Sequence, residues 1–325
     1  MTELQSSEWF RVPPPDDTAN TLVQEVQELK KSYNAIILAH RYQRIGVQQI
    51  ADVIGDSYDL SVAATKTSAP TIVFCGVRFM AETTKLLNPM KTVLLPESMA
   101  GCALADTITA AEVRSLKQEH PDASVVMYIN CSAEVKAECD AICTSANAQK
   151  VIEAMPTQKV IFGPDRNLAE RMKQRCSKEL IIAGGYCPVH KEITREMLES
   201  TLAKYPDAIV LVHPECNPDV QELADAVLGT TGMVEHVRMS KAKRFIIGTE
   251  QGLIQKMQLD FPEKEIHPIY RHKSCDESCA CPFMKLTKLA SVKRALVQGT
   301  EEITVPAHLA PRALRAVQRM MEIGK

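Results

Sequence analysis

Three short stretches of the chain follow one pattern: ADVIGDS at 51–57, CDAICTS at 139–145 and ADAVLGT at 224–230. Each has a small residue, an aspartate, two apolar residues, two variable positions and a final serine or threonine. Their spacing along the chain of 325 residues is nearly constant. An internal repeat of this kind predicts three similar units, each built as one supersecondary structure.

Strand-like apolar runs occur at nearly the same offsets in all three units. They are NAIILAH (34–40), TIVFCG (71–76) and KTVLLP (91–96) in the first unit, SVVMYIN (124–130), KVIFGP (159–164) and ELIIAG (179–184) in the second, and AIVLVHP (208–214), RFIIGT (244–249) and EIHPIY (265–270) in the third. The runs are continuously apolar, which is typical of parallel strands buried on both faces.

Helical patterns lie between these runs. VQQIADVI (47–54) and PDVQELADAVL (218–228) have apolar residues three and four positions apart. Strands that alternate with helices predict parallel sheets covered on both faces. We therefore expect an α/β fold of three pseudo-symmetric, three-layer α/β/α domains with short parallel sheets around a central active site. One long doubly wound sheet is the alternative, but such a sheet would not require Ser57, Ser145 and Thr230 to recur at a nearly constant spacing.

The repeat also predicts the domain boundaries. The expected segments are an N-terminal arm (1–19), three α/β repeats (20–105, 106–190 and 191–285) and C-terminal helices that pack back on the repeats (286–325). The arm contains RVPPPDD (11–17), which favours an extended and weakly held segment. HLAPRALRAVQRMMEIG (308–324) has the apolar spacing of an amphipathic helix.

Composition disfavours several classes of partner. The net charge is −2 and aromatic residues make up 5% of the chain, which argues against nucleic acid or an anionic membrane. MTELQSSEWF (1–10) does not resemble a signal peptide, and no apolar run is long enough to span a bilayer. We therefore expect a cytoplasmic protein that acts on small molecules. Its eleven cysteines should be mostly reduced there, and some should bind metal.

Polar residues follow the first strand of each unit in phase. The pairs are His40 and Tyr42, Tyr128 and Asn130, and His213 and Glu215. Ligands of open parallel sheets bind beyond the carboxyl ends of the strands, and residues two apart share one face of an extended chain. If the three edges meet on a pseudo-threefold axis, six polar side chains converge. For any single one of them, an ordinary loop position is the alternative.

Ser57, Ser145 and Thr230 each precede a helical pattern. We expect N-cap positions, and capping alone is the simpler interpretation. A helix N-terminus also offers free N–H groups and partial positive charge to an anion. Three of them around one centre would suit substrates with a phosphate and carboxylates. The glycine-rich phosphate-binding motifs of dinucleotide and nucleoside triphosphate sites are absent from the sequence.

Three cysteines also follow the repeat. Cys102 and Cys187 are as far apart in the sequence as the second and third repeated stretches. Cys281 lies close to the position that the repeat predicts for the third unit, once a small insertion is allowed. Three converging thiolates match a soft metal or an iron–sulfur cluster in which one iron keeps an open position. The alternative is three small buried side chains.

Ten motifs in this order resemble the quinolinate synthase family, the A protein of bacterial NAD biosynthesis. They are LAHRYQ (38–43), ADVIGDS (51–57), FCGVRFMAETTKLLNP (74–89), MYINCSAE (127–134), TSANA (144–148), IFGPDRNLA (161–169), YCPVH (186–190), HPECNPDV (213–220), GTTGM (229–233) and CPFMK (281–285). The resemblance covers nearly the whole chain and implies a [4Fe–4S] cluster held by Cys102, Cys187 and Cys281. It also implies condensation of iminoaspartate with dihydroxyacetone phosphate to quinolinate, with loss of phosphate and two waters.

The resemblance further implies the site residues. The catalytic candidates are Tyr42, Glu215, His40 and His213. The substrate-binding candidates are His40, Ser57, Tyr128, Asn130, Ser145, His213, Glu215 and Thr230. His190, three residues after the second cluster cysteine, is a weaker carry-over.

The last cysteine loop, SCDESCACPF (274–283), departs from the family, whose members carry C-x2-C-x2-C or a single cysteine there. We assign the ligand to Cys281 because CPFM matches the family's ligand motif. Cys275 and Cys279 could form a redox pair or act as spare ligands, but a plain loop role is the simpler interpretation.

Two other functions stay open from the sequence. One is another [4Fe–4S] dehydratase, acting on a small phosphorylated or dicarboxylic substrate. The other is a non-enzymatic scaffold that is stapled by zinc or senses redox state. The sequence also leaves open whether an L-aspartate oxidase delivers iminoaspartate by transient contact.

Overall fold

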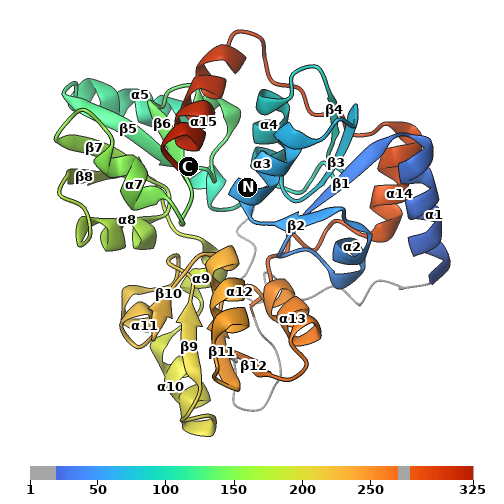
Figure 1. Cartoon of the computed structure of the whole chain (residues 1–325). Helices are drawn as coiled ribbons and strands as arrows, with labels where there is room; N and C mark the ends of the chain where they lie inside the picture. The colour runs from blue at the N-terminus through green and yellow to red at the C-terminus, as the bar shows by residue number, and fades with distance from the viewer. Residues whose placement is uncertain (1–19, 270–278, 325) are drawn as a thin grey trace.

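The computed structural model describes residues 20–269 and 279–324, which form three lobes around a common centre (Figure 1). The first lobe contains α1 (Asn20–Ser32), β1 (Ala35–His40), α2 (Ile45–Ile50), β2 (Val53–Gly55), α3 (Ser57–Lys66), β3 (Thr71–Cys75), α4 (Arg78–Leu87) and β4 (Thr92–Leu94). The second contains η1 (Ala105–Thr107), α5 (Ala110–Glu119), β5 (Ala123–Tyr128), α6 (Ala133–Lys136), β6 (Ala141–Cys143), α7 (Ala148–Glu153), β7 (Lys159–Gly163), α8 (Arg166–Lys173) and β8 (Glu179–Ile182).

The third lobe follows through α9 (Pro188–Lys191) and has the same plan. It contains α10 (Arg195–Lys204), β9 (Ile209–Val212), α11 (Pro218–Glu222), β10 (Ala226–Val227), α12 (Thr230–Met239), β11 (Arg244–Gly248), α13 (Gln251–Asp260) and β12 (Glu265–Pro268). The helices α14 (Leu289–Gln298) and α15 (Ala310–Gly324) end the chain. The arm predicted at 1–19 lies outside the described residues.

Each lobe has one parallel four-stranded sheet, and the strand order is identical in all three. The orders are β2-β1-β3-β4, β6-β5-β7-β8 and β10-β9-β11-β12. All pairings within these sheets are parallel. The predicted α/β fold with three short parallel sheets is therefore confirmed, and the single long sheet is excluded.

The repeated aspartate has a structural role in every lobe. Its carboxylate accepts a hydrogen bond from the backbone of the first strand of the lobe, which is β1, β5 or β9 and is called the central strand below. The bonds run from Ile37 N to Asp52 Oδ2 (2.8 Å), from Val125 N to Asp140 Oδ2 (2.7 Å) and from Val210 N to Asp225 Oδ2 (2.8 Å). This contact fixes where the edge strand begins, which explains why the aspartate keeps phase.

The helical patterns predicted at 47–54 and 218–228 are wrong in their second halves. The helices end at Ile50 and Glu222, and the remaining apolar residues form the edge strands β2 and β10. Apolar spacing could not separate the two elements because the edge strands have only three and two residues. Their pairing with the central strands decides their conformation.

Alternate residues of the central strands face different apolar clusters, which creates the three layers. In β1, Ile37 packs with residues of α1 and α14, whereas Leu38 packs in a central core. In β5, Val125 packs with residues of α5 and α6, whereas Val126 faces the central core. β9 shows the same alternation. Each sheet thus turns one face to its own helices and the other to a core shared by all three lobes.

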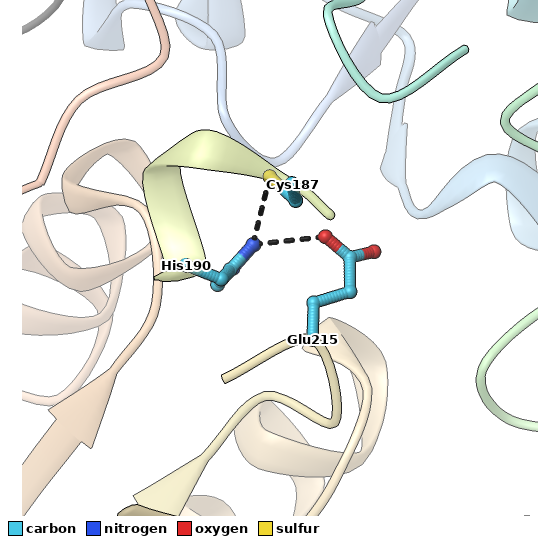
Figure 2. A group of neighbouring side chains, drawn as sticks. All are labelled: Cys187, His190 and Glu215. Atoms are coloured by element: carbon cyan, nitrogen blue, oxygen red, sulfur yellow. Dashed lines mark hydrogen bonds and ion pairs between the residues drawn. The ribbon is translucent and has the colours of Figure 1, made fainter. Parts of the chain in front are cut away.

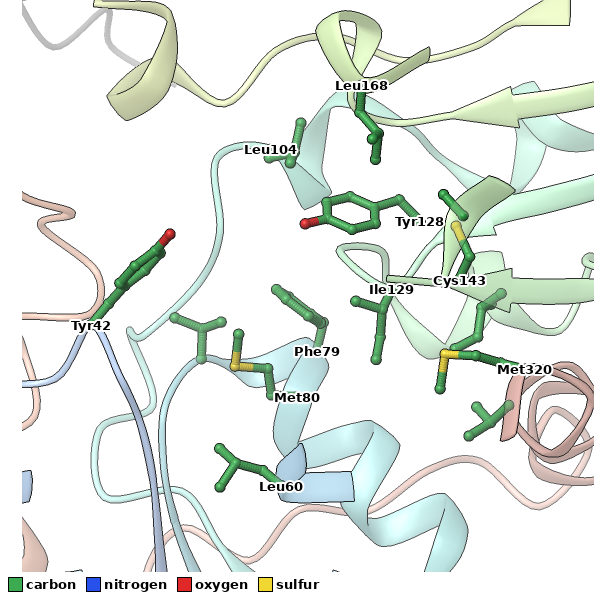
Figure 3. Packing of buried hydrophobic residues seen from close by; sticks show 14 of the residues in the cluster. Tyr42, Leu60, Phe79, Met80, Leu104, Tyr128, Ile129, Cys143, Leu168 and Met320 are labelled. Atoms are coloured by element: carbon green, nitrogen blue, oxygen red, sulfur yellow. The ribbon is translucent and has the colours of Figure 1, made fainter. Parts of the chain in front are cut away.

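The two C-terminal helices return to earlier parts of the chain. Leu289 and Val292 of α14 pack in the cluster that covers β1 and β3. From α15, Met320 points towards Ile129 and Cys143 of the second lobe (Figure 3). α15 also contacts α4 of the first lobe, so it joins two lobes.

From the three sheets and the contacts of α14 and α15, we propose three units with the boundaries 20–105, 106–190 and 191–285. The segment 286–325 then packs back on the earlier units. Within the described residues, no helix is long and apolar enough to cross a membrane.

Candidate active site

One cavity lies where the carboxyl ends of the central strands β1, β5 and β9 meet. Its lining includes all twelve residues selected from the sequence, namely His40, Tyr42, Ser57, Cys102, Tyr128, Asn130, Ser145, Cys187, His213, Glu215, Thr230 and Cys281. His190 lines it as well, and apolar residues such as Phe79 and Leu104 complete the wall. The structure therefore brings side chains from all three lobes into one enclosed space.

A buried side-chain donor holds the loop after each central strand. Gln48, Lys136 and Gln221 occupy equivalent positions of the repeat. Their hydrogen bonds go from Gln48 Nε2 to Arg41 O (3.0 Å) and Gln43 O (2.9 Å), from Lys136 Nζ to Cys131 O, and from Gln221 Nε2 to Pro214 O (3.0 Å) and Cys216 O (2.7 Å). These loops carry the polar pairs of the site, so the three donors fix the backbone that presents them.

His40 and His213 are neutral and have the same tautomer. Burial lowers the pKa of each imidazole to about 3. His40 Nδ1 accepts a hydrogen bond from Tyr42 N (3.2 Å), and His213 Nδ1 accepts one from Glu215 N (3.3 Å). An accepting nitrogen carries no proton, so the ring proton of each histidine is on Nε2. Both residues can therefore donate one hydrogen bond to a ligand without carrying charge.

Glu215 is an ionised carboxylate held by two neighbours. Tyr128 donates its hydroxyl to Glu215 Oε1 (2.7 Å), and His190 Nδ1 lies 2.9 Å from Glu215 Oε2. Burial alone would raise the pKa of Glu215, but His213, His190 and the Tyr128 hydroxyl together lower it below its usual range. An ionised carboxylate only accepts hydrogen bonds, so the proton of the His190 ring is on Nδ1.

The network extends to the first lobe. His190 Nε2 forms a hydrogen bond with the Thr249 hydroxyl (2.9 Å). The Thr249 hydroxyl also forms a hydrogen bond with the Tyr42 hydroxyl (2.7 Å). A buried chain of hydrogen bonds thus runs from Tyr42 through Thr249 and His190 to Glu215.

The two tyrosines of this network stay protonated. Burial raises the pKa of Tyr42 and Tyr128 well above the usual value, and the charge of Glu215 raises both further. Each is therefore a hydrogen-bond donor and a possible acid, but not a resting base.

The prediction that Ser57, Ser145 and Thr230 are N-caps is wrong. The N-caps of α3, α7 and α12 are Asp56, Asn147 and Gly229. In α3 the Asp56 side chain accepts hydrogen bonds from the free N–H groups of Tyr58 and Asp59. Ser57 and Thr230 are instead the first residues of their helices. The Thr230 hydroxyl is buried without a partner among the described residues, which leaves it available to a ligand.

The three cavity cysteines are unpaired thiols, one from each lobe. Burial raises the pKa of Cys102 to about 12, that of Cys281 to about 11 and that of Cys187 well above the usual value. The charge of Cys281 raises the pKa of Cys102 and of Cys187 further, so these thiolates would repel one another. A metal centre is what would hold three such thiolates together, and this donor set fits an iron–sulfur cluster.

A mixed group of ligands overlaps this set. One ligand atom each of Cys187, His190 and Glu215 lies within 4.8 Å of the others, and His190 Nδ1 is 3.2 Å from Cys187 Sγ (Figure 2). This group could also hold a single metal ion. Because it shares Cys187 with the cysteine set, the two arrangements exclude each other.

Cys275 lies outside the described residues, and Cys279 is buried next to the Cys281 loop. The sequence also missed two features of the site. Thr249 has no counterpart in the other lobes, so no repeat singled it out. Lys136 was missed because the equivalent residues are glutamines, although its offsets from Gln48 and Gln221 match the repeat.

Known proteins give the context of this site. A profile of the family described as quinolinate synthetase A protein matches residues 24–322. The quinolinate synthase of Thermodesulfovibrio yellowstonii is 48% identical over 305 residues, covering 94% of this chain and 99% of that protein. The one from Geobacter metallireducens is 46% identical over 307 residues, with 94% and 99% covered. The one from Synechocystis sp. is 43% identical over 313 residues, with 96% and 98% covered.

Among solved structures, the E-1-hydroxy-2-methyl-but-2-enyl-4-diphosphate reductase of Plasmodium falciparum shares 11% identity, with 78% of this chain and 88% of that chain covered. The TM-score of 0.29 is too low to carry an argument. The near full-length profile match and the three quinolinate synthases decide the assignment. This chain belongs to the quinolinate synthetase A protein family.

Proposed function

We propose that this protein is a quinolinate synthase of NAD biosynthesis that condenses iminoaspartate with dihydroxyacetone phosphate. The products are quinolinate, phosphate and two waters, which balances all atoms of the two substrates. The observation that supports this most is the single cavity lined by one cysteine and two polar strand-end residues from each lobe. A condensation with several eliminations needs acids, bases and anion-binding groups at one centre, and this cavity has them.

Anion binding would fall to neutral donors. The Nε2–H groups of His40 and His213 and the hydroxyls of Ser57 and Thr230 all line the cavity. The N-termini of α3 and α12 add the partial positive charge of their helices. Two helix N-termini would bind anions instead of the three that the sequence predicts. The N-terminus of α7 is left out because this helix has only six residues and begins three residues after Ser145.

Proton transfer would use the hydrogen-bonded chain that starts at Tyr42. Tyr42 can donate its hydroxyl proton to a leaving oxygen, and the Thr249 hydroxyl can then donate a hydrogen bond to the resulting phenolate. Glu215 is ionised and can accept a proton from the substrate carbon or nitrogen. Tyr128 would orient this carboxylate through its 2.7 Å hydrogen bond.

Cys102, Cys187 and Cys281 would hold a [4Fe–4S] cluster. When bound, the cluster supplies a Lewis acid at the iron that has no cysteine, which favours loss of hydroxyl groups. The apolar wall around Phe79 and Leu104 excludes bulk water, which protects an imine from hydrolysis. Iminoaspartate is unstable in water, and we propose that an L-aspartate oxidase in the same cytoplasmic compartment supplies it by transient contact.

The test is anaerobic purification followed by metal analysis and assay. The protein should contain about four irons and four sulfides per chain, and it should form quinolinate from the two substrates. Cys102→Ser, Cys187→Ser and Cys281→Ser should each lose the cluster. Cys176→Ser is the matched control, because Cys176 is an unpaired cysteine outside the cavity.

Two results would contradict the proposal. A colourless protein with one zinc per chain would favour a single ion at the group of Cys187, His190 and Glu215. A cluster-loaded protein that dehydrates another phosphorylated or dicarboxylic compound but forms no quinolinate would favour a different dehydratase.

A further inference from the structure

The loop that carries each cavity cysteine is tied to the helix after the third strand of its lobe, namely α4, α8 or α13. The backbone N–H of the first helical residue donates to the carbonyl two residues before the cysteine. The bonds run from Arg78 N to Ala100 O (2.8 Å), from Arg166 N to Gly185 O (2.9 Å) and from Gln251 N to Cys279 O (2.8 Å). The three cysteine loops are therefore equivalent in structure, although Cys281 lies slightly beyond the position that the repeat predicts.

In the second lobe, the N-cap of this helix also holds the cysteine itself. Asp165, the N-cap of α8, is fully buried. Its Oδ1 atom accepts from Asn167 N (2.7 Å) and Leu168 N (3.0 Å), as a capping residue does. Its Oδ2 atom accepts from Cys187 N (2.8 Å). One carboxylate thus joins the helix to the backbone of a cavity cysteine.

The third lobe repeats this arrangement with a longer side chain. Glu250, the N-cap of α13, is also fully buried. Its Oε2 atom accepts from Gly252 N (2.7 Å), and its Oε1 atom accepts from Cys281 N (3.0 Å). Lys285 Nζ lies 2.8 Å from Oε1 and also donates to Tyr42 O. The Cys281 loop is therefore linked both to its own helix and to the loop of a catalytic candidate.

The first lobe differs, because the equivalent N-cap is Val77. Its side chain has no hydrogen-bonding group, so Cys102 N–H receives no carboxylate from this position. Capping alone does not explain the two acids. The Asp56 carboxylate caps α3 with one oxygen, and the Thr109 hydroxyl caps α5 without reaching a cysteine.

We propose that Asp165 and Glu250 are positioning residues for two of the three cluster cysteines, whereas Cys102 has no such carboxylate from the equivalent cap, Val77. The inference rests on the proposed function, since it assumes that these cysteines bind the cluster. A carboxylate that fixes the N–H of a ligating cysteine limits the directions that its sulfur can take.

Asp165→Asn separates the two roles of the side chain. Asparagine is a good N-cap and keeps one oxygen for α8, but its amide group then faces the N–H of Cys187 and cannot accept from it. Asp140→Asn is the matched control. Asp140 is in the same lobe and also accepts a backbone N–H, but this N–H belongs to Val125 and not to a cavity cysteine.

The experiment measures how fast a chelator removes iron from the anaerobic holoprotein. We expect Asp165→Asn to lose iron about tenfold faster than the wild type. Asp140→Asn should lose iron at the wild-type rate. Amide exchange on the metal-free protein should show faster exchange at Cys187 in Asp165→Asn alone.

The third lobe supplies a second variant. Glu250→Gln by itself would leave the buried ammonium of Lys285 without its partner, so the double change Glu250→Gln and Lys285→Met is used. It should also release iron faster than the wild type.

Wild-type rates of iron release in both variants would overturn the inference while leaving the proposed function intact. An Asp140→Asn protein that changes as much as Asp165→Asn would also overturn it, because the effect would then be general destabilisation. A wild-type protein that holds no iron–sulfur cluster would instead refute the proposed function, and with it any cluster-positioning role.

Discussion

Replacing Thr249 by valine should break the chain of hydrogen bonds that joins Tyr42 to His190. The threonine hydroxyl links them, at 2.7 Å from the Tyr42 oxygen and 2.9 Å from His190 Nε2. Valine has nearly the same shape, so the change removes the hydroxyl without opening a cavity. Thr249 is 2% exposed, and water therefore cannot easily replace the lost group.

The expected cost follows from the two partners that are left behind. A buried polar group that loses its partner costs about 1–3 kcal/mol, and both Tyr42 and His190 are buried. We expect Thr249→Val to lower the free energy of unfolding by about 2–5 kcal/mol. Thr249→Ser keeps the hydroxyl and loses one methyl group, so it should cost only about 1 kcal/mol.

Thr84→Val is the matched control, because Thr84 is fully buried and its hydroxyl has no partner among the described residues. Removing it should change stability by less than about 1 kcal/mol or be slightly stabilising. The assay is urea unfolding of the metal-free, reduced protein at neutral pH, followed by circular dichroism. The reasoning fails if Thr249→Val is as stable as Thr84→Val, or if Thr249→Ser loses as much as Thr249→Val.

Three further predictions concern the scaffold of the site. The pKa of His40 is about 3 in the folded protein and near 6.5 when unfolded, so between these values the unfolded state binds an extra proton and the wild type loses about 1.4 kcal/mol of stability per pH unit as pH falls. His40→Gln should lack this dependence in urea unfolding at pH 6, 5 and 4, and equal slopes for the two proteins would contradict the prediction. Lys136→Gln should lower the free energy of unfolding by less than about 2 kcal/mol, because glutamine makes the same carbonyl contact in the other lobes, whereas Lys136→Met should lower it more. Equal losses of stability in thermal unfolding would show that the carbonyl contact does not matter. Asp52→Asn and Asp225→Asn should each cost about 1 kcal/mol, since their carboxylates make the same strand contact, and a large difference between the two in urea unfolding would contradict an equivalent role.

The sequence predicted the fold well because the fold is itself repeated. The aspartate of each repeated stretch binds the central strand, so its phase reported a contact that every lobe needs. The apolar runs marked three of the four strands of each lobe, and the two inner strands among them are almost fully buried. The edge strands β2, β6 and β10 escaped detection because they have only two or three residues.

The site was predictable only where its residues also keep phase. The strand-end pairs and two of the three cysteines could be found by offset alone. Thr249 could not, because its role depends on reaching a residue of each neighbouring lobe, and no equivalent contact exists elsewhere in the described residues. The N-caps were misplaced because hydroxyl and carboxylate residues stand side by side in Asp56–Ser57, and only the backbone geometry shows which one caps.

Equivalent positions with different side chains account for how a symmetric scaffold can carry an asymmetric reaction. Tyr42, Asn130 and Glu215 follow their central strands at the same place in the repeat. They provide an acid, a neutral amide and an ionised carboxylate to one cavity. The caps Val77, Asp165 and Glu250 differ in the same way behind the three cysteines. The repeated backbone thus places the groups, and the departures from the repeat decide their chemistry, so substitutions that restore symmetry at these positions should damage function while leaving the fold intact.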